Sequence, residues 1–220
     1  MNDQIVVVLD RSGSMSTIQS DMEGGLNEFI QQQRVVSPHA EFTLVKFDHE
    51  YLMELDRYPI EGVKPIRLEP RGMTALHDAI GRTINYLRER MHCPNCGDRA
   101  KVVFAVITDG HENASKEYNG SDIKHLINQM KKERDWQFVF LGANQDAIQT
   151  GEQYGINSNA SITYTANAGG VRGVTQAFSN ATSCYLADMS NSVTFNQDDR
   201  EQAVSNDPVP ELKTETTTGA

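Results

Sequence analysis

Apolar residues along this chain fall into two kinds of pattern, short unbroken runs and longer stretches with helical spacing. Residues 5–9 read Ile-Val-Val-Val-Leu and residues 102–107 read Val-Val-Phe-Ala-Val-Ile, each without a polar interruption. Such runs are expected for strands of a parallel sheet that is covered on both faces. In several segments that follow the runs, apolar residues recur every three or four positions, which predicts helices.

The alternation of strands with helices predicts a doubly wound, mostly parallel α/β sheet with helices on both faces. The six predicted strands are residues 5–9, 41–47, 51–55, 101–107, 136–142 and 161–165. The predicted helices cover residues 18–30, 75–87, 121–130, 146–154 and 171–189. Residues 51–55 are expected to pair with the preceding strand as an antiparallel edge hairpin. The stretch 59–70, which holds three prolines, is expected to be an extended connection.

The C-terminal segment has a different composition from the rest of the chain. From residue 196 onward it is acidic and rich in threonine, with no apolar period. Such a segment buries too little apolar surface to offset the entropy of ordering. Because 220 residues with 38% hydrophobic content suit one core, the sequence predicts a single domain over residues 1–195 and a disordered tail over residues 196–220.

Charge and hydropathy narrow the range of partners. The formal net charge is −10, and residues 188–220 carry seven acidic against two basic side chains. An acidic chain is not expected to bind nucleic acid or an anionic membrane surface. The sequence contains no apolar stretch of the roughly 20 residues that a transmembrane helix needs, and its first residues do not resemble a signal peptide. We therefore expect a cytoplasmic protein.

The chemistry of the chain is concentrated where two predicted core strands end. Asp10 follows the first strand and opens the motif Asp10-Arg11-Ser12-Gly13-Ser14, in which a carboxylate is followed by two hydroxyls at alternate positions. Asp109 follows the strand 101–107. Ligands of doubly wound sheets bind outside the carboxyl ends of strands, and oxygen-only donors suit a hard cation such as Mg²⁺. The alternative is that these serines and aspartates only cap helices.

A third segment favours the metal-site interpretation over helix capping. Thr74 stands directly before a predicted helix, in the sequence Gly72-Met73-Thr74-Ala75-Leu76. With this segment, residues 4–190 resemble the von Willebrand factor A (vWA) family, which has a Rossmann-like fold and a metal-ion-dependent adhesion site (MIDAS). The family's site combines Asp-x-Ser-x-Ser, a loop threonine and a later loop aspartate in this order. The resemblance implies that the metal residues are Asp10, Ser12, Ser14, Thr74 and Asp109.

The resemblance also implies how the site works. In the family, the hydroxyls contact the metal directly and the aspartates act largely through water, so that the ion stays short of one strong donor. An Asp or Glu of a protein partner then completes the metal shell. The implied function is a Mg²⁺-dependent protein-binding module without catalytic residues, in which Mn²⁺ can replace Mg²⁺. The early start of the domain, at residue 4, resembles intracellular bacterial and phage members of the family.

Several residues near these motifs have two interpretations. Arg11 and Arg71 either rim the site and receive an acidic ligand or are solvated loop residues. His77 is interpreted as a residue that packs the helix or supports the site, because imidazole is not a preferred Mg²⁺ donor. Glu112 is predicted to be a solvated surface residue, with approach to the metal as the alternative.

Cys93 and Cys96 form half of a zinc knuckle in the sequence Cys-Pro-Asn-Cys. The default interpretation is two reduced thiols in a loop, with a redox pair or a Zn²⁺ site as alternatives. A structural Zn²⁺ needs four ligands, and the third cysteine, Cys184, is distant in sequence. If zinc binds here, two chains would share it in a homodimer.

Two other functional classes compete with the binding module. A phosphohydrolase of the haloacid dehalogenase type also places a metal-bound aspartate after its first strand, but it needs a second aspartate two residues later as the general acid. Ser12 occupies that position. The second class is an accessory subunit that recruits substrates to an ATPase or chelatase. The chain itself has no phosphate-binding loop and no dinucleotide fingerprint.

Overall fold

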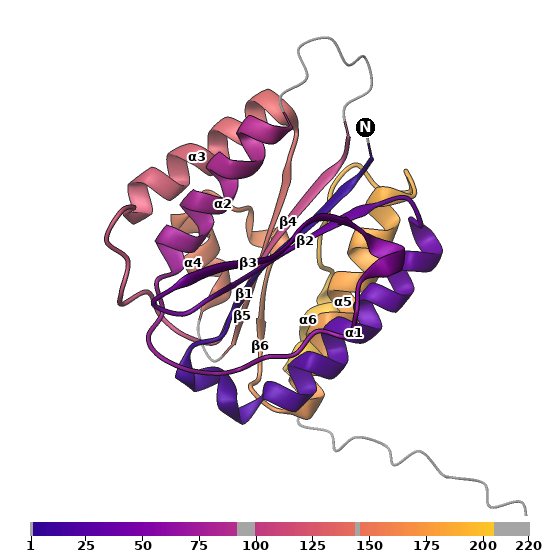
Figure 1. Ribbon diagram of the computed structural model, residues 1–220. Helices are drawn as coiled ribbons and strands as arrows, with labels where there is room; N and C mark the ends of the chain where they lie inside the picture. The colour runs from indigo at the N-terminus through magenta and orange to yellow at the C-terminus, as the bar shows by residue number, and fades with distance from the viewer. Residues whose placement is uncertain (1, 92–99, 144–145, 205–220) are drawn as a thin grey trace, which may run out of the picture.

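The computed structural model describes residues 2–91, 100–143 and 146–204 and consists of one sheet between two layers of helices (Figure 1). The strand order is β3-β2-β1-β4-β5-β6, and every neighbouring pair is parallel except β2 with β3. The strands are β1 (Gln4–Asp10), β2 (Glu41–Phe47), β3 (Tyr51–Pro59), β4 (Val102–Thr108), β5 (Gln137–Ala143) and β6 (Ser161–Tyr164). The predicted fold class is confirmed.

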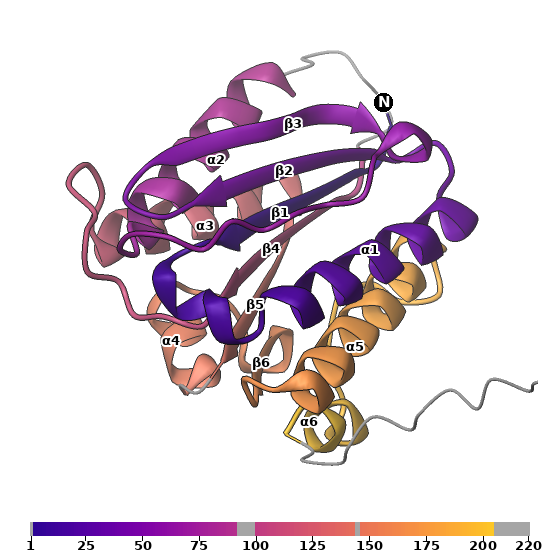
Figure 2. The same cartoon turned by 60° about the horizontal axis from the view of Figure 1, so that its bottom comes forward.

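The helices divide between the two faces of the sheet, as Figures 1 and 2 show. The α-helices are α1 (Gln19–Val36), α2 (Leu76–Arg90), α3 (Gly120–Arg134), α4 (Ala147–Gln153), α5 (Ala168–Leu186) and α6 (Gln197–Ala203). Short 3₁₀ helices are η1 (Gly13–Thr17), η2 (Ile60–Gly62) and η3 (Ser158–Ala160). Helices α1 and α5 bury their apolar residues on one face of the sheet, and α2 and α3 bury theirs on the other.

Strand β1 shows why the central apolar runs have no polar interruption. Its side chains alternate between the two cores, with Val7 in the cluster under α1 and α5 and with Val6 and Val8 in the cluster under α2 and α3. All seven residues of β1 are buried. A strand that is covered on both faces needs apolar side chains at every position.

The strand order places a ligand site at the ends of β1 and β4. From β1 the chain proceeds outward through β2 to β3, and it then crosses back to add β4, β5 and β6 on the other side of β1. The order therefore reverses between β1 and β4, and crevices at such switch points are where ligands of doubly wound sheets bind. Asp10 ends β1, and Asp109 directly follows β4.

The connection from β3 to α2 packs on α1 and so fixes the start of the next loop. Its residues Ile66 and Leu68 are buried. Asn27 of α1 accepts a hydrogen bond from the backbone nitrogen of Ile66 at 2.7 Å, and Glu23 accepts one from that of Leu68 at 2.8 Å. The predicted extended connection therefore holds a defined path along the helix.

The C-terminal boundary predicted at residue 195 is corrected by helix α6, because residues 197–203 fold onto the domain. Asn196 and Asp199 form a reciprocal capping box at its start. Ala203 is fully buried, and its carbonyl oxygen accepts a hydrogen bond from Thr165 at 3.0 Å. Arg200 donates to the carbonyl oxygen of Ser161 at 2.8 Å. Residues 205–220 of the predicted tail lie outside the described residues.

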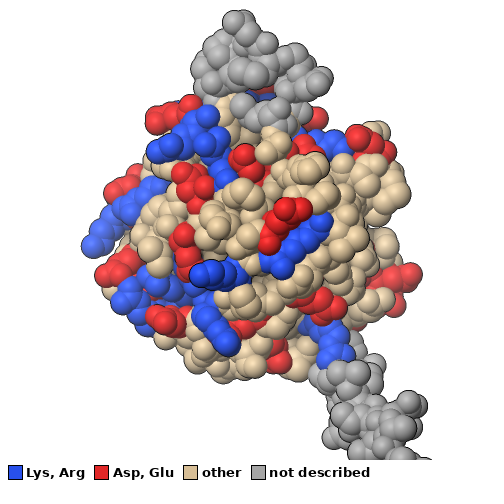
Figure 3. Space-filling model, turned by 45° about the vertical axis from the view of Figure 1, so that its right-hand side comes forward, with Lys and Arg blue, Asp and Glu red and all other residues tan. Residues whose placement is uncertain are grey.

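The surface carries charged side chains of both signs (Figure 3). On the face drawn in Figure 3, basic and acidic side chains lie next to one another over much of the surface. Within the described residues, none of the helices combines the length and the apolar character that crossing a membrane requires.

Candidate metal centre

Three loops meet at the ends of β1 and β4, and hydrogen bonds tie them together. The loop after β1 is joined to the loop before α2 by Gly13, whose backbone nitrogen donates to the carbonyl oxygen of Gly72 at 3.2 Å. The loop before α2 is joined to the loop after β4 twice. Thr74 donates its backbone nitrogen to Asn113 Oδ1 at 2.9 Å, and Asn113 donates its own to the carbonyl oxygen of Thr74 at 3.0 Å. All five predicted metal residues therefore lie in one connected set of loops.

Asp10 is the innermost of these residues and has no solvent exposure. Its Oδ1 accepts the backbone nitrogen of Ser12 at 2.6 Å, and its Oδ2 accepts Thr108 Oγ1 at 2.6 Å. Burial raises the pKa of Asp10 to about 6, although the hydrogen bonds from Thr108 and Ser12 oppose that rise. A buried carboxylate is costly unless a positive charge compensates it. The environment of Asp10 therefore favours a nearby cation.

The two serines connect Asp10's loop to the second aspartate. Ser12 Oγ lies 3.0 Å from Ser14 Oγ, and Ser14 Oγ donates to Asp109 Oδ1 at 2.6 Å. Burial also raises the pKa of Asp109. Ser12 precedes η1 but makes no side-chain capping hydrogen bond, which removes the capping interpretation for this serine. Ser14 is exposed, so the site opens to solvent.

Gly110, in the loop after β4, marks a point where oxygens of the other two loops converge. A Cβ atom added to Gly110 would lie 3.1 Å from Thr74 Oγ1, 3.6 Å from Ser14 Oγ and 3.7 Å from Asp10 Oδ2. One point outside the backbone is thus surrounded by two hydroxyls and one carboxylate. Among the described residues, no three His, Cys, Asp or Glu side chains gather to hold a metal. The donor set of hydroxyls and two carboxylates instead fits a hard, oxygen-loving cation.

Replacement of Gly110 by alanine is expected to weaken divalent metal binding by about tenfold, an effect comparable to mutating a residue that supports metal ligands. The added methyl group would press on Thr74 Oγ1 and displace the hydroxyl. Calorimetric titration with Mn²⁺ measures the affinity. The matched control is Gly24→Ala on α1, where an added Cβ has no neighbour within 4 Å. Equal Mn²⁺ affinities in the two variants would contradict convergence of the donors at Gly110.

His77 and Glu112 support the loops rather than face the oxygen donors. His77 Nε2 lies 3.0 Å from the hydroxyl of Tyr154, and the two rings make an edge-on contact, so His77 packs against α4's C-terminal end. Glu112 was predicted to be solvated, and this is wrong. Its carboxylate is partly buried and accepts the backbone nitrogens of His77, Ala114 and Ser115 at 2.7 to 2.9 Å. Glu112 therefore shapes the loop after β4.

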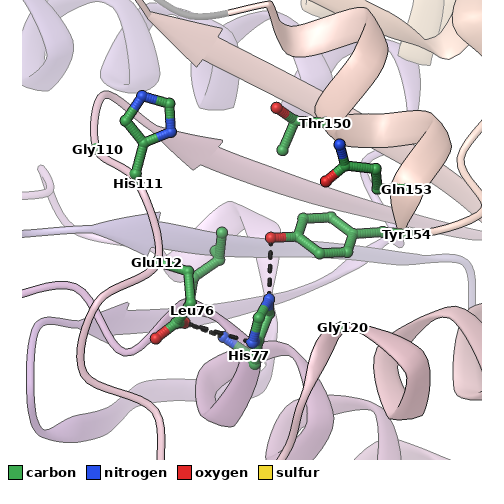
Figure 4. A pocket seen from close by; sticks show the side chains of 9 residues that line it. All are labelled: Leu76, His77, Gly110, His111, Glu112, Gly120, Thr150, Gln153 and Tyr154. Carbon is green, nitrogen blue, oxygen red and sulfur yellow. Dashed lines mark hydrogen bonds and ion pairs between the residues drawn. The ribbon is translucent and has the colours of Figure 1, made fainter.

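A pocket of about 400 Å³ adjoins the candidate metal centre at Gly110. Figure 4 shows His77 and Tyr154 pointing toward one another across it, with Thr150 and Gln153 on the side of α4. The remaining lining residues are Leu76, His111, Glu112 and Gly120. The molecular surface is therefore hollowed directly beside the converging oxygens.

Arg11 and Arg71 do not extend freely over the site. Both pair with Asp48, which follows β2, at 3.0 Å and 2.9 Å, and Arg11 is only 7% exposed. The solvated interpretation therefore fails for Arg11, while Arg71 is half exposed. Asp48 was not among the residues predicted from the sequence. The signal was present, since an aspartate directly follows the predicted strand Glu41–Phe47, as Asp109 follows β4.

Cys93 and Cys96 lie outside the described residues, so the zinc, redox and dimer interpretations of this pair are not addressed by the structure. Cys184 on α5 is a free cysteine and is partly buried.

Comparisons with known proteins agree with the observed fold. The sequence model described as von Willebrand factor type A domain matches residues 4–177, and no curated protein sequence matches the chain. Proximal thread matrix protein 1 from the mussel byssus, solved with a zinc-occupied MIDAS motif, is 15% identical with a TM-score of 0.58; the match covers 83% of this chain and 46% of that one. A von Willebrand factor type A structure from Catenulispora acidiphila is 16% identical with a TM-score of 0.54, covering 83% and 43%. This chain thus spans less than half the length of either structure.

Proposed function

This chain belongs to the von Willebrand factor type A domain family, and from that premise we propose that it is a metal-dependent protein-binding module. In this proposal the five residues Asp10, Ser12, Ser14, Thr74 and Asp109 form a MIDAS that holds Mg²⁺, and a protein partner supplies an Asp or Glu to it. A structural neighbour with a zinc-occupied MIDAS supports a divalent ion in this kind of site.

The observation that carries the proposal is the convergence of oxygens at Gly110. Hydroxyls of Thr74 and Ser14 and the carboxylate of Asp10 surround one point, although their loops are far apart in the sequence. Two of the site's residues are carboxylates whose pKa is raised by burial. Such a pair has negative charge to offer and lacks full solvation, which is the condition for binding a cation.

The donor types explain binding of an acidic partner. When Mg²⁺ is bound, it supplies an electrophilic position for an outside carboxylate. Asp10 and Asp109 balance the ion's two charges, and the hydroxyls of Ser12, Ser14 and Thr74 add no further charge. An additional carboxylate is therefore attracted rather than repelled. The exposed position of Ser14 leaves a route to the site from solvent.

The adjoining pocket enlarges the surface of this chain that a partner could contact beyond the metal. It begins at Gly110 and is bounded by His77, Tyr154 and residues of α4. The His77 and Tyr154 side chains hold one another by the 3.0 Å hydrogen bond and an edge-on ring contact. A rigid hollow of this kind can receive a partner side chain next to the acidic one, because preorganised groups lose little entropy on binding.

A binding role is preferred over hydrolysis of the haloacid dehalogenase type because the position of that enzyme's general acid holds no carboxylate here. In the haloacid dehalogenase arrangement that position would be an aspartate two residues after Asp10. Here it is Ser12, whose hydroxyl lies against that of Ser14. The proposal is therefore a module without catalytic residues.

Removal of metal is expected to remove the partner. Tagged chain would be incubated with lysate of its source cell in Mg²⁺ and in EDTA, and the retained proteins identified by mass spectrometry. Proteins retained in Mg²⁺ should be absent in EDTA and absent with Ser14→Ala, but present with Ser20→Ala, an exposed serine of α1. Substitution of the partner's acidic residues should then abolish binding to the purified chain. An identical set of proteins in Mg²⁺ and EDTA would contradict the proposal.

A further inference from the structure

A third strand-end carboxylate, Asp48, lies beside the candidate metal centre and is fully buried. Its Oδ2 lies 3.0 Å from Arg11 Nε and 2.9 Å from Arg71 Nε. Its Oδ1 accepts the backbone nitrogen of Glu50 at 2.6 Å and lies 3.3 Å from His49 Nδ1. One carboxylate thus contacts a residue from each of two metal loops.

The backbone around Asp48 makes the same connection. The carbonyl oxygen of Asp48 accepts a hydrogen bond from Ala75 at 2.8 Å, and that of Phe47 accepts one from Arg11 at 2.8 Å. Arg71 in turn donates its backbone nitrogen to the carbonyl oxygen of Arg11 at 2.8 Å. Arg11 lies between two predicted ligands in the chain, and Ala75 directly follows a third. The turn after β2 therefore fixes the positions from which the hydroxyls of Ser12 and Thr74 project.

Charge gives Asp48 a second effect on the same site. Arg11 is buried and stands between Asp10 and Ser12 in the chain, and Arg71 lies in the loop that carries Thr74, so the loops of the candidate metal centre include two cationic residues. Without a compensating negative charge, these two arginines would oppose cation binding, because solvent screens charges only weakly in a partly buried environment. Asp48 pairs with both of them, and Glu50 pairs with Arg71 and lies 4.0 Å from Arg11. The four charges sum to zero.

We propose that Asp48 is a positioning residue of the metal centre, which joins the Arg11 and Arg71 loops and neutralises their charge so that a divalent cation can bind. The inference rests on the proposed function, because it concerns affinity for the same ion. Asp48 itself is turned toward the arginines and does not belong to the ligand set. Residues that orient metal ligands from outside the coordination shell commonly change affinity by about 10- to 100-fold when mutated.

The test is Mn²⁺ affinity by calorimetry in Asp48→Asn, which keeps the size of the side chain but removes its charge. We expect affinity to fall by about 10- to 100-fold. The double variant Asp48→Asn with Arg71→Gln should recover part of the loss, because the excess positive charge is gone. A wild-type affinity in Asp48→Asn would overturn the proposal, and a loss with no recovery in the double variant would overturn its electrostatic part.

The control is Glu54→Gln, which removes the same charge from another ion pair of the β2–β3 hairpin, that with Lys46. It should leave Mn²⁺ affinity unchanged. Melting temperatures measured in EDTA distinguish the positioning role of Asp48 from a merely structural one. A merely structural role would lower the melting temperature of Asp48→Asn without changing the Mn²⁺ affinity of the folded protein. If Asp48→Asn does not fold, Glu50→Gln replaces it, because Glu50 is 58% exposed. That variant should bind Mn²⁺ about two- to fivefold more weakly, and no difference from Glu54→Gln would overturn the proposal.

The same Mn²⁺ titrations distinguish failure of the proposed function from failure of the proposed role of Asp48. A wild-type chain that binds no Mn²⁺ overturns the proposed function and the role of Asp48 together. A wild-type chain that binds Mn²⁺ as tightly as the Asp48→Asn variant retains the metal centre and overturns only the positioning role.

Discussion

Replacement of Asp10 by alanine is expected to abolish the rise in melting temperature that Mg²⁺ gives to the wild-type chain. A ligand present at 100 times its dissociation constant stabilises the folded state by about 2.7 kcal/mol. For a chain of this length that corresponds to a rise of roughly 5–10 °C. The variant loses the innermost carboxylate, which accepts hydrogen bonds from both Ser12 and Thr108. Without it, the remaining hydroxyls carry too little negative charge to hold the ion.

The informative quantity is the difference between the melting temperatures of each variant in Mg²⁺ and in EDTA. Asp10→Ala also changes the stability of the metal-free chain, because it removes a buried carboxyl group and the 2.6 Å hydrogen bond that this group accepts from Thr108 Oγ1. Asp198→Ala, at an exposed acid in the first turn of α6, is the control and should keep the full Mg²⁺-dependent rise. A rise in Asp10→Ala equal to that of Asp198→Ala would contradict the assignment of Asp10.

Truncation after Phe195 is expected to lower the melting temperature in EDTA by roughly 5–15 °C. The deletion removes α6 and with it the hydrogen bonds from Thr165 to Ala203 and from Arg200 to Ser161. It also uncovers Gly170 and Gly173 of α5, whose added Cβ atoms would meet the backbone of α6 within 3 Å. Each lost hydrogen bond contributes about 0.5–1.5 kcal/mol, and exposing the contact adds to that.

A chain that ends at Val204 is the matched control for this truncation. It keeps α6 and removes only residues 205–220, whose sequence has no apolar period, so its melting temperature should stay within about 2 °C of the full chain. Circular dichroism at increasing temperature measures both variants. Equal melting temperatures for the chains ending at Phe195 and Val204 would show that α6 contributes nothing to stability.

The central sheet was predictable because its signal is local. The unbroken apolar runs of β1 and β4 are typical of strands that are covered on both faces, and the aspartates at their ends mark the sheet edge where ligands bind. In the structure, oxygens of Asp10, Ser14 and Thr74 lie around Gly110. The expectation that these residues lie together was specific only because the motif has three parts that are far apart in the sequence.

Helix α6 was missed because its signal is not apolar periodicity. Its seven residues read Gln-Asp-Asp-Arg-Glu-Gln-Ala, and Ala203 alone is buried. The helix is held by backbone contact with glycines of α5 and by Arg200, which donates to carbonyl oxygens near β6. A pattern of apolar spacing does not record such contacts. The capping box at Asn196 and Asp199 was the available local signal.

Asp48 and Glu112 were missed or misplaced for a related reason. Both are carboxylates, which are usually exposed. Here Asp48 is buried between two arginines, and Glu112 accepts three backbone nitrogens from its own loop and from α2. Which carboxylate turns inward depends on partners that are far apart in sequence. The contacts of the loops at the candidate site could therefore be learned only from the structure, whereas the strands that carry these loops could be predicted from the sequence.

The most direct test of the account is a calorimetric titration of the wild-type chain with Mn²⁺, followed by competition with Mg²⁺. The account predicts saturable binding of one Mn²⁺ per chain at the converging oxygens of Asp10, Ser12, Ser14, Thr74 and Asp109, with displacement by Mg²⁺. Addition of a carboxylate-bearing partner should then raise the Mn²⁺ affinity, because the partner completes the metal shell and the coupling is reciprocal. Absence of saturable Mn²⁺ binding to the folded wild-type chain would contradict the account.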